Sequence, residues 1–183
     1  MLDAGVGALQ LRLKVTPEGE AVPLIRQAVA WASHTQTAVI VNDRADWALL
    51  AGADGVHLGA DDVPISVARR ALGSQAIVGA TVRSEKDLHA AHAAGADYVG
   101  LGPVFTSSTK PGSVPPLGLE GFGTLAGKSR LPVVAISGLR AEHMTALAAL
   151  GAYAAAVGAA VWNAPDITAG AKALNAAFLV RMK

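Results

Sequence analysis

Short apolar runs and helical stretches alternate along the whole chain. One phrase recurs along the chain, and in each copy a small residue at its start leads into a short apolar run. The copies are GADGVHLG from Gly52, GADYVGLG from Gly95 and GAYAAAVG from Gly151, with a looser copy, GVGALQLR, from Gly5. Glycine directly after an Ala/Leu-rich helix is the usual left-handed helix stop, and the apolar residues that follow it are typical of a strand. Strands of a second kind, β-branched and almost continuously apolar, are predicted at residues 37–43, 76–82 and 132–137. The pattern therefore predicts seven strands of two alternating kinds.

Helices are expected between the strands, at residues 21–33, 45–50, 65–72, 85–94, 120–126, 141–150 and 167–179. Strict alternation of strand and helix favours an α/β fold with a parallel sheet. Two alternating strand types favour a (β/α)8 TIM barrel, whose interior is filled in layers from alternate strands. An open doubly wound sheet is the alternative, but no G-x-G-x-x-G follows the first strand. Seven units do not close an eight-stranded barrel, so the first strand and helix would be missing at the N-terminus.

Composition narrows the classes of function. The chain has 183 residues, a length typical of one barrel domain spanning 1–183. A net charge of +1 and the lack of a basic run argue against a nucleic-acid partner or a membrane surface. No apolar run approaches the ~20 residues of a membrane span. Cysteine is absent, which excludes disulfides and Cys-based zinc sites and fits a cytoplasmic enzyme.

Polar side chains gather where the predicted strands end, which is where parallel α/β proteins carry their binding sites. In chain order they are Gln10, Arg12 and Lys14; Asn42 and Asp43; His57 with Asp61 and Asp62; Thr81; Thr106, Ser107, Ser108, Thr109 and Lys110; Ser137 and Gly138; and Gly158 and Ala159. Each has a simpler interpretation when taken alone. Asp43 and Asp62 could cap helices, His57 could be a hydrogen-bonded core residue, and the three tryptophans look like packing residues. The shared location is what favours a site.

The residue types indicate what such a site would hold. Arg12, Lys14 and Lys110 come from different strands, and three converging cations suit a polyanion such as a diphosphate. Asp43 and Asp62 are hard oxygen donors, and two carboxylates beside a diphosphate are a common way to hold Mg²⁺. The glycines after the last two strands expose backbone N–H groups, as in the usual phosphate position of a barrel.

Four motifs together resemble the thiamine phosphate synthase family over nearly the whole chain. They are QLRLK from Gln10, VNDRADWALLAGADGVHLGADD from Val41, GADYVGLGPVFTSSTKPG from Gly95 and PPLGLEGF from Pro115. The resemblance implies a (β/α)8 barrel that joins hydroxymethylpyrimidine diphosphate to a thiazole phosphate, giving thiamine phosphate and diphosphate. It also implies phosphorylated small-molecule substrates and Mg²⁺ as cofactor.

The resemblance assigns roles by motif position. The residues that would bind the pyrimidine diphosphate are Gln10, Arg12, Lys14, Asn42, Thr81 and Lys110. Of these, Arg12, Lys14 and Lys110 would be the catalytic cations. The residues that would bind the metal are Asp43 and Asp62. The residues that would bind the thiazole phosphate are Ser107, Ser108, Thr109, Gly138, Gly158 and Ala159. The chain departs from the family where Ser137 replaces a usual glycine and where the common serine at position 159 is alanine.

Two other functions stay open at this stage. The thiazole tautomerase branch of the same superfamily is expected to carry a histidine where this chain has Pro103, and to lack the carboxylates and lysines that are present here. A non-catalytic ligand-binding or regulatory barrel would fit the missing first strand. That missing strand would also leave apolar sheet edges, which invite formation of a homo-oligomer.

Overall fold

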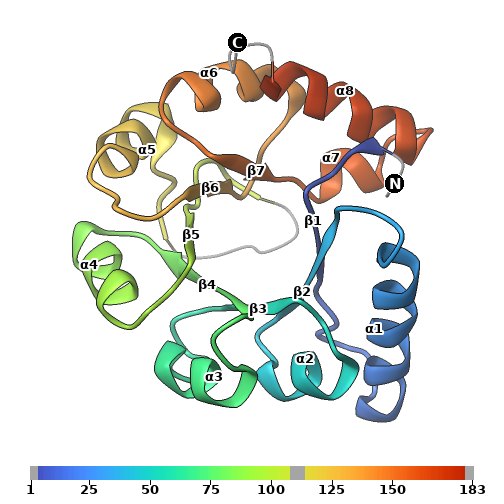
Figure 1. Cartoon of the computed structure of the whole chain (residues 1–183). Helices are drawn as coiled ribbons and strands as arrows, with labels where there is room; N and C mark the ends of the chain where they lie inside the picture. The colour runs from blue at the N-terminus through green and yellow to red at the C-terminus, as the bar shows by residue number, and fades with distance from the viewer. Residues whose placement is uncertain (1–3, 108–113, 180–183) are drawn as a thin grey trace.

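The computed structural model describes residues 4–107 and 114–179. Within these ranges seven parallel strands form one sheet, in which each strand pairs with its neighbours in the sequence (Figure 1). The strands are β1 (Ala8–Leu11), β2 (Ala38–Asn42), β3 (Gly55–Leu58), β4 (Ile77–Val82), β5 (Tyr98–Leu101), β6 (Val133–Ile136) and β7 (Ala154–Ala156). The helices are α1 (Glu18–Ala32), α2 (Ala45–Ala51), α3 (Ile65–Leu72), α4 (Glu85–Ala93), α5 (Gly118–Ala126), α6 (Met144–Ala149), α7 (Ala159–Trp162) and α8 (Ile167–Leu179), with a 3₁₀ turn η2 (Ala141–His143) before α6.

The sheet curls into most of a barrel, with the helices outside it (Figure 1). The outward-facing valines of four successive strands, Val39, Val56, Val78 and Val99, have no exposed surface. They pack beneath the helices, so the main core lies between the sheet and its helical cover. This is the expected reason for continuously apolar strands in a parallel sheet covered on its outer face.

The aspartate of the repeated GAD phrase ties each strand to the one before it. Asp54 accepts the backbone N–H of Val39 at 2.7 Å, and Asp97 accepts that of Val78 at 2.7 Å. Tyr153 occupies the corresponding place in the third copy, and its side chain cannot accept in the same way as a carboxylate. The repeat therefore registers neighbouring strands at their amino ends, which is a role in stability rather than in chemistry.

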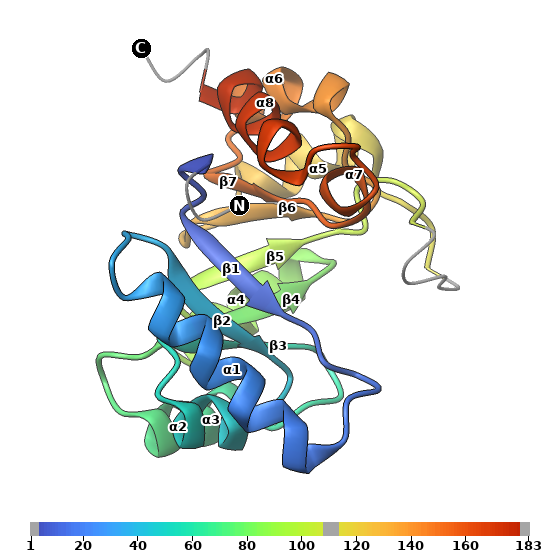
Figure 2. The ribbon, with the colours of Figure 1, turned by 90° about the vertical axis from the view of Figure 1, so that its right-hand side faces the viewer.

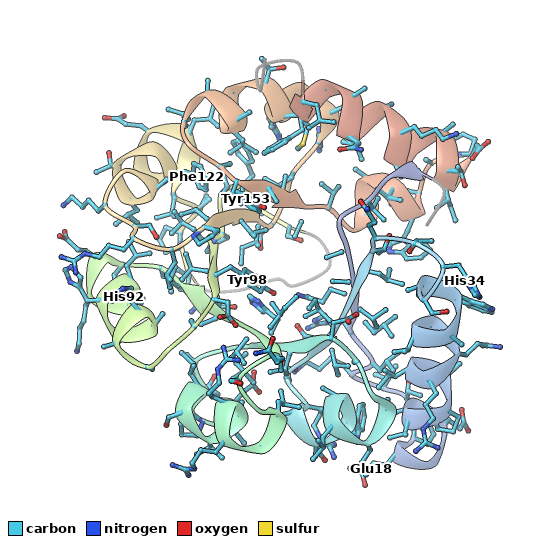
Figure 3. The ribbon with its side chains drawn as sticks, viewed as in Figure 1. Glu18, His34, His92, Tyr98, Phe122 and Tyr153 are labelled. Carbon is cyan, nitrogen blue, oxygen red and sulfur yellow. The ribbon has the colours of Figure 1, made fainter. Side chains whose placement is uncertain are left out.

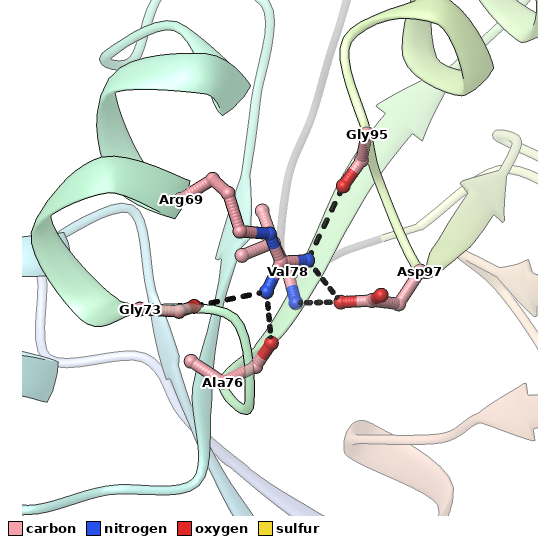
Figure 4. A network of polar contacts seen from close by, with 6 residues as sticks. All are labelled: Arg69, Gly73, Ala76, Val78, Gly95 and Asp97. Atoms are coloured by element: carbon pink, nitrogen blue, oxygen red, sulfur yellow. Dashed lines mark hydrogen bonds and ion pairs between the residues drawn. The ribbon is translucent and has the colours of Figure 1, made fainter.

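Arg69 of α3 extends this link at Asp97 (Figure 4). Its guanidinium donates to the carbonyl oxygens of Gly73 at 3.3 Å, Ala76, and Gly95 at 3.2 Å, and forms an ion pair with Asp97 at 2.5 Å. One side chain thus joins the end of α3 to the starts of β4 and β5.

The sheet is open between its first and last strands. In the described part of the chain, β1 pairs only with β2 and β7 only with β6. Residues of β1 and β7 are correspondingly exposed or half-buried, whereas β3 is buried along its length. The predicted parallel α/β barrel fold is confirmed, with seven strands in the described residues.

Several local predictions need correction. Helix α1 begins at Glu18 rather than at residue 21, and the helix expected at 141–150 divides into η2 and α6. Helix α7 was not predicted, because four residues directly after a strand leave no periodic pattern. Trp47 is buried as expected, but the packing role was wrong for Trp31 and Trp162, which are 62% and 58% exposed. No helix among residues 4–107 and 114–179 is long and apolar enough to cross a membrane.

Candidate functional site

Figure 2 shows β1, β2 and β3 side by side. A pocket lies at the carboxyl ends of these three strands. Its volume is about 220 Å³. The lining residues are Leu13, Lys14, Asn42, Asp43, Arg44, Trp47 and Asp62. Four of the predicted site residues, Lys14, Asn42, Asp43 and Asp62, therefore share one pocket although they come from three strand ends.

Asp43 is directed into this pocket by an unusual backbone conformation. Its φ angle is 67°, in the left-handed region that non-glycine residues seldom adopt. Its backbone N–H donates to the carbonyl of His57 at 2.8 Å, and its carboxylate forms an ion pair with Lys14. The alternative role as a helix cap does not hold, because Arg44 is the cap residue of α2 and no side chain caps that helix.

Arg44 is engaged elsewhere, although it lines the same pocket. It forms ion pairs with Glu18 at 2.8 Å and Asp46 at 2.5 Å, and its guanidinium carbon lies 4.1 Å from the ring centroid of Trp47. Arg44 therefore pairs with Glu18 and Asp46, whereas Lys14 pairs with Asp43.

Asp62 is held near Asp43 by the loop after β3. One carboxylate oxygen accepts the backbone N–H of Gly59 at 2.6 Å. Burial raises the pKa of Asp62, and the neighbouring Asp43 raises it further against the lowering effect of Gly59 and Lys14. Two carboxylates held side by side repel each other, and such an arrangement is stabilised when a cation binds between them.

The charge of Asp43 is favoured by its neighbours. Burial by itself raises the pKa of this carboxyl, but hydrogen bonds with Lys14 and Asp62 and the charges of Lys14 and Arg12 outweigh burial and hold it below its usual range. The exposed Arg12 is thereby placed within electrostatic reach of the pocket, as the sequence predicts. Asp43 is accordingly ionised at neutral pH.

A second polar group lies inside the curl of the sheet. His57 is buried, with Nδ1 2.9 Å from the hydroxyl of Tyr98 and Nε2 2.9 Å from the hydroxyl of Thr81. Tyr98 also hydrogen-bonds with the side chain of Gln10. Gln10 and Thr81 are thus joined through His57 and Tyr98.

Sequence reasoning missed Tyr98, because it begins an apolar strand and its neighbours across the sheet are not adjacent in the sequence. The available signal was glycine at interior positions of the adjoining strands, since Gly79 and Gly100 provide the room that the two rings occupy. His57 fits the interpretation as a hydrogen-bonded core residue.

The remaining predicted residues follow β5, β6 and β7. Ser107 is half-buried in the loop after β5, while Ser108, Thr109 and Lys110 lie outside the described residues. Gly138 follows β6 with φ +70°, and a Cβ there would lie 2.5 Å from the backbone oxygen of Thr106. Gly158 precedes α7 and Ala159 is its first residue. Ser107, Gly138, Gly158 and Ala159 thus follow strands in the half of the sheet formed by β5, β6 and β7, away from the Asp43 pocket at the ends of β1, β2 and β3.

Ser137 keeps the turn after β6 despite replacing a glycine of the family pattern. Its φ angle is 74°, so a non-glycine residue adopts the left-handed conformation next to Gly138. Left-handed non-glycine residues therefore directly follow both β2 and β6, and strain of this kind is common at binding sites.

Comparison with known proteins identifies the family. The family model described as thiamine monophosphate synthase matches residues 1–161. The chain is 46% identical over 177 residues to a thiamine-phosphate synthase from Anaeromyxobacter dehalogenans, covering 97% of this chain and 79% of that protein. It is 48% identical over 178 residues to a thiamine-phosphate synthase from Myxococcus xanthus, covering 97% and 82%. The chain belongs to the thiamine monophosphate synthase family.

Solved structures agree with the family assignment. Thiamine phosphate pyrophosphorylase from Pyrococcus furiosus superposes with a TM-score of 0.88 at 32% identity, covering 97% of this chain and 85% of that one. A 3-hexulose-6-phosphate synthase superposes with a TM-score of 0.72 at 24% identity, a likeness that shows the fold alone.

Proposed function

We propose that this protein is a thiamine-phosphate synthase, a transferase that joins hydroxymethylpyrimidine diphosphate to a thiazole phosphate. Membership of the family and close relatives of that name support the reaction. The observation that carries the proposal is the pocket in which Lys14, Asp43 and Asp62 meet at the ends of three strands. A cation and two carboxylates beside one another match the needs of a metal-bound diphosphate.

The pyrimidine diphosphate is assigned to the half of the sheet that holds this pocket. Arg12 and Lys14 face the diphosphate as cations, together with Lys110, which lies outside the described residues. Asn42 lines the same pocket, while Gln10 and Thr81 belong to the interior polar group. Their contacts suit a substrate with a charged end at the strand ends and a heterocycle that reaches into the curl.

Mg²⁺ fits the donor set formed by Asp43 and Asp62. No group of three or more His, Cys, Asp or Glu side chains that could enclose a metal occurs in the described ranges. Mg²⁺ does not need one, because it commonly binds through one or two carboxylates, waters and substrate phosphates. The two neighbouring carboxylates and the raised pKa of Asp62 support a cation at this place. When bound there, the ion would neutralise negative charge on the diphosphate.

The thiazole phosphate is assigned to the half formed by β5, β6 and β7. Ser107, Ser108 and Thr109 would contact the thiazole substrate, and the backbone around Gly138, Gly158 and Ala159 would bind its phosphate. The consecutive left-handed φ angles of Ser137 and Gly138 support this assignment, since turns with such residues are a common way to direct backbone N–H groups at an anion.

The chemistry needs no general base. The bond between the pyrimidine methylene carbon and the diphosphate oxygen breaks, and the electron pair leaves with the diphosphate. The thiazole nitrogen then donates its lone pair to the methylene carbon, forming the new carbon–nitrogen bond. Arg12, Lys14 and Lys110 stabilise the charge that develops on the leaving group, and the protein holds the two substrates in line.

Turnover of both substrates tests the proposal and separates it from its alternatives. Thiamine phosphate and diphosphate should form together in the presence of Mg²⁺. Isomerisation of the thiazole phosphate without coupling would indicate a tautomerase, and binding without turnover would indicate a non-catalytic barrel. Asp43→Ala should abolish coupling with the fold intact. Asp61→Ala removes an exposed carboxylate one residue from Asp62 and is the matched control that should keep it.

The cytoplasmic location, the absence of nucleic-acid and membrane partners, and a homo-oligomeric state remain predictions. The exposed edges of β1 and β7 support association with another copy, because unpaired strand edges promote pairing between chains. Light scattering at several protein concentrations measures it directly.

A further inference from the structure

Four side chains from four strands form a continuous chain of hydrogen bonds inside the sheet. Gln10 of β1 bonds with Tyr98 of β5. Tyr98 lies 2.9 Å from His57 of β3, and His57 lies 2.9 Å from Thr81 of β4. Figure 3 shows Tyr98 inside the curl, away from the surrounding helices. The two ends of this chain, Gln10 and Thr81, are the residues assigned above to the pyrimidine.

The backbone makes room for both rings. A Cβ at Gly79 would lie 2.1 Å from Cζ of Tyr98, and a Cβ at Gly100 would lie 2.9 Å from Cε1 of His57. Any larger residue at Gly79 would therefore displace Tyr98. The rings are confined by the strands facing them, so the hydroxyl and the imidazole have fixed positions.

The number of protons on these side chains indicates which group donates in each hydrogen bond. Burial raises the pKa of Tyr98 and keeps its hydroxyl protonated, and the lowering effect of the Gln10 hydrogen bond on that pKa fits a Gln10 amide N–H directed at the tyrosine oxygen. The tyrosine proton then needs an acceptor, and Nδ1 of His57, 2.9 Å from the hydroxyl, provides one when the imidazole carries its proton on Nε2. A neutral imidazole that accepts at Nδ1 carries its proton on Nε2, and Nε2–H donates to the oxygen of Thr81. The Thr81 hydroxyl proton is left pointing away from His57.

We propose that Tyr98 and His57 are positioning residues that fix the polarity of the pyrimidine site. They leave the carbonyl oxygen of Gln10 as an acceptor and the hydroxyl of Thr81 as a donor. This inference rests on the proposed function. A 4-aminopyrimidine complements such a site, with an amino group that donates and a ring nitrogen that accepts. The 4-oxo analogue has a carbonyl that accepts and a ring N–H that donates, so the site should reject it.

Tyr98→Phe tests the inference, because it keeps the ring above Gly79 and removes only the hydroxyl. The matched control is Tyr153→Phe, which removes the hydroxyl of the second tyrosine in the chain, a residue 66% exposed. In Tyr98→Phe, the KM for the aminopyrimidine diphosphate should rise about tenfold, as expected for one misdirected, partly buried hydrogen bond. The KM for the thiazole phosphate and inhibition by inorganic diphosphate should not change.

Discrimination between the two pyrimidines is the second measurement. The wild type should favour the amino over the 4-oxo diphosphate by at least about a hundredfold in kcat/KM, because a site built around a substrate hydrogen bond rejects an analogue that cannot make it. Tyr98→Phe should lose most of that ratio, and Tyr153→Phe should keep it. A merely structural role for Tyr98 would lower stability and leave the ratio intact.

Nitrogen NMR of histidine-labelled wild-type protein provides a readout that needs no turnover. The His57 signals should show a neutral ring protonated at Nε2, and Tyr98→Phe should lose this single tautomer. A proton on Nδ1 in the wild type, or an unchanged KM and unchanged discrimination in Tyr98→Phe, overturns the inference. Failure of the wild type to couple the two substrates would instead refute the proposed function, and the NMR result would still decide the direction of the hydrogen bonds.

Discussion

Replacing Gly79 with alanine places a methyl group where the ring of Tyr98 lies. The added carbon would be 2.1 Å from Cζ, 2.3 Å from Cε1 and 2.5 Å from the hydroxyl oxygen of Tyr98. These separations are far inside van der Waals contact, so the ring must move. Gly79 and Tyr98 are also register partners on β4 and β5, which limits how far the backbone can shift to relieve the contact.

The size of the effect follows from overpacking. Forcing extra carbon into a packed interior costs about 1–3 kcal/mol. For a chain of this size, that loss lowers the melting temperature by roughly 2–12 °C. Since the displaced Tyr98 no longer meets Gln10 and His57, the KM for the pyrimidine diphosphate should rise as well, by about the tenfold expected for Tyr98→Phe.

A double-mutant cycle isolates the contact. Urea unfolding is measured for the wild type, Gly79→Ala, Tyr98→Ala and the double variant. In the Tyr98→Ala background the methyl group has space, so Gly79→Ala should cost less than about 0.5 kcal/mol or even stabilise, because glycine is unfavourable inside a strand. Additive losses in the cycle, or a single Gly79→Ala variant with unchanged stability and KM, would refute the placement of Tyr98 against Gly79.

Three further substitutions test separate parts of the structure. Asp62→Asn should abolish Mg²⁺-dependent coupling while leaving stability at pH 7 unchanged or higher than in the wild type. Because burial raises the pKa of Asp62 in the folded state, ionisation of Asp62 lowers the free energy of unfolding. This loss is fully present above the folded-state pKa and absent below the unfolded-state pKa. Thermal melts should therefore show a gain in stability for Asp62→Asn at pH 7 that is smaller at pH 3, and no such gain for the control Asp61→Asn. Arg69→Leu should cost about 2–3 kcal/mol in urea unfolding by breaking four hydrogen bonds of a half-buried guanidinium, and a loss under about 0.5 kcal/mol would contradict its role. Ser84→Ala should cost about 1 kcal/mol, because Ser84 caps α4, and Ser84→Gly should cost only a few tenths.

The architecture was accessible from the sequence because each strand carries its own local signal. Continuous apolar runs and the repeated GAD phrase mark seven strands, and alternation with helices predicts parallel pairing. Element ends were less accessible. The 3₁₀ turn before α6 and the four-residue helix α7 depend on tertiary packing, and neither is long enough to show a helical period. The exposure of Trp31 and Trp162 likewise depends on which helix face meets the sheet.

The charged part of the candidate site could also be predicted from the sequence. Lys14, Asp43 and Asp62 stand at strand ends, and parallel topology alone brings such ends together. The polar group inside the sheet could not be predicted from the sequence. Tyr98 contacts Gln10 and His57 only because of the register of separate strands and the space left by Gly79 and Gly100. Loop residues 108–110 carry predicted contacts that stay predictions.

The most direct measurement is formation of thiamine phosphate by the purified protein from hydroxymethylpyrimidine diphosphate, thiazole phosphate and Mg²⁺. Product should appear with an equal amount of diphosphate, stop when the metal is chelated, and be lost in Asp43→Ala but not in Asp61→Ala. No product from the wild type, or equal product from Asp43→Ala in a folded state, would contradict the assignment of Lys14, Asp43 and Asp62 to a metal-bound leaving group.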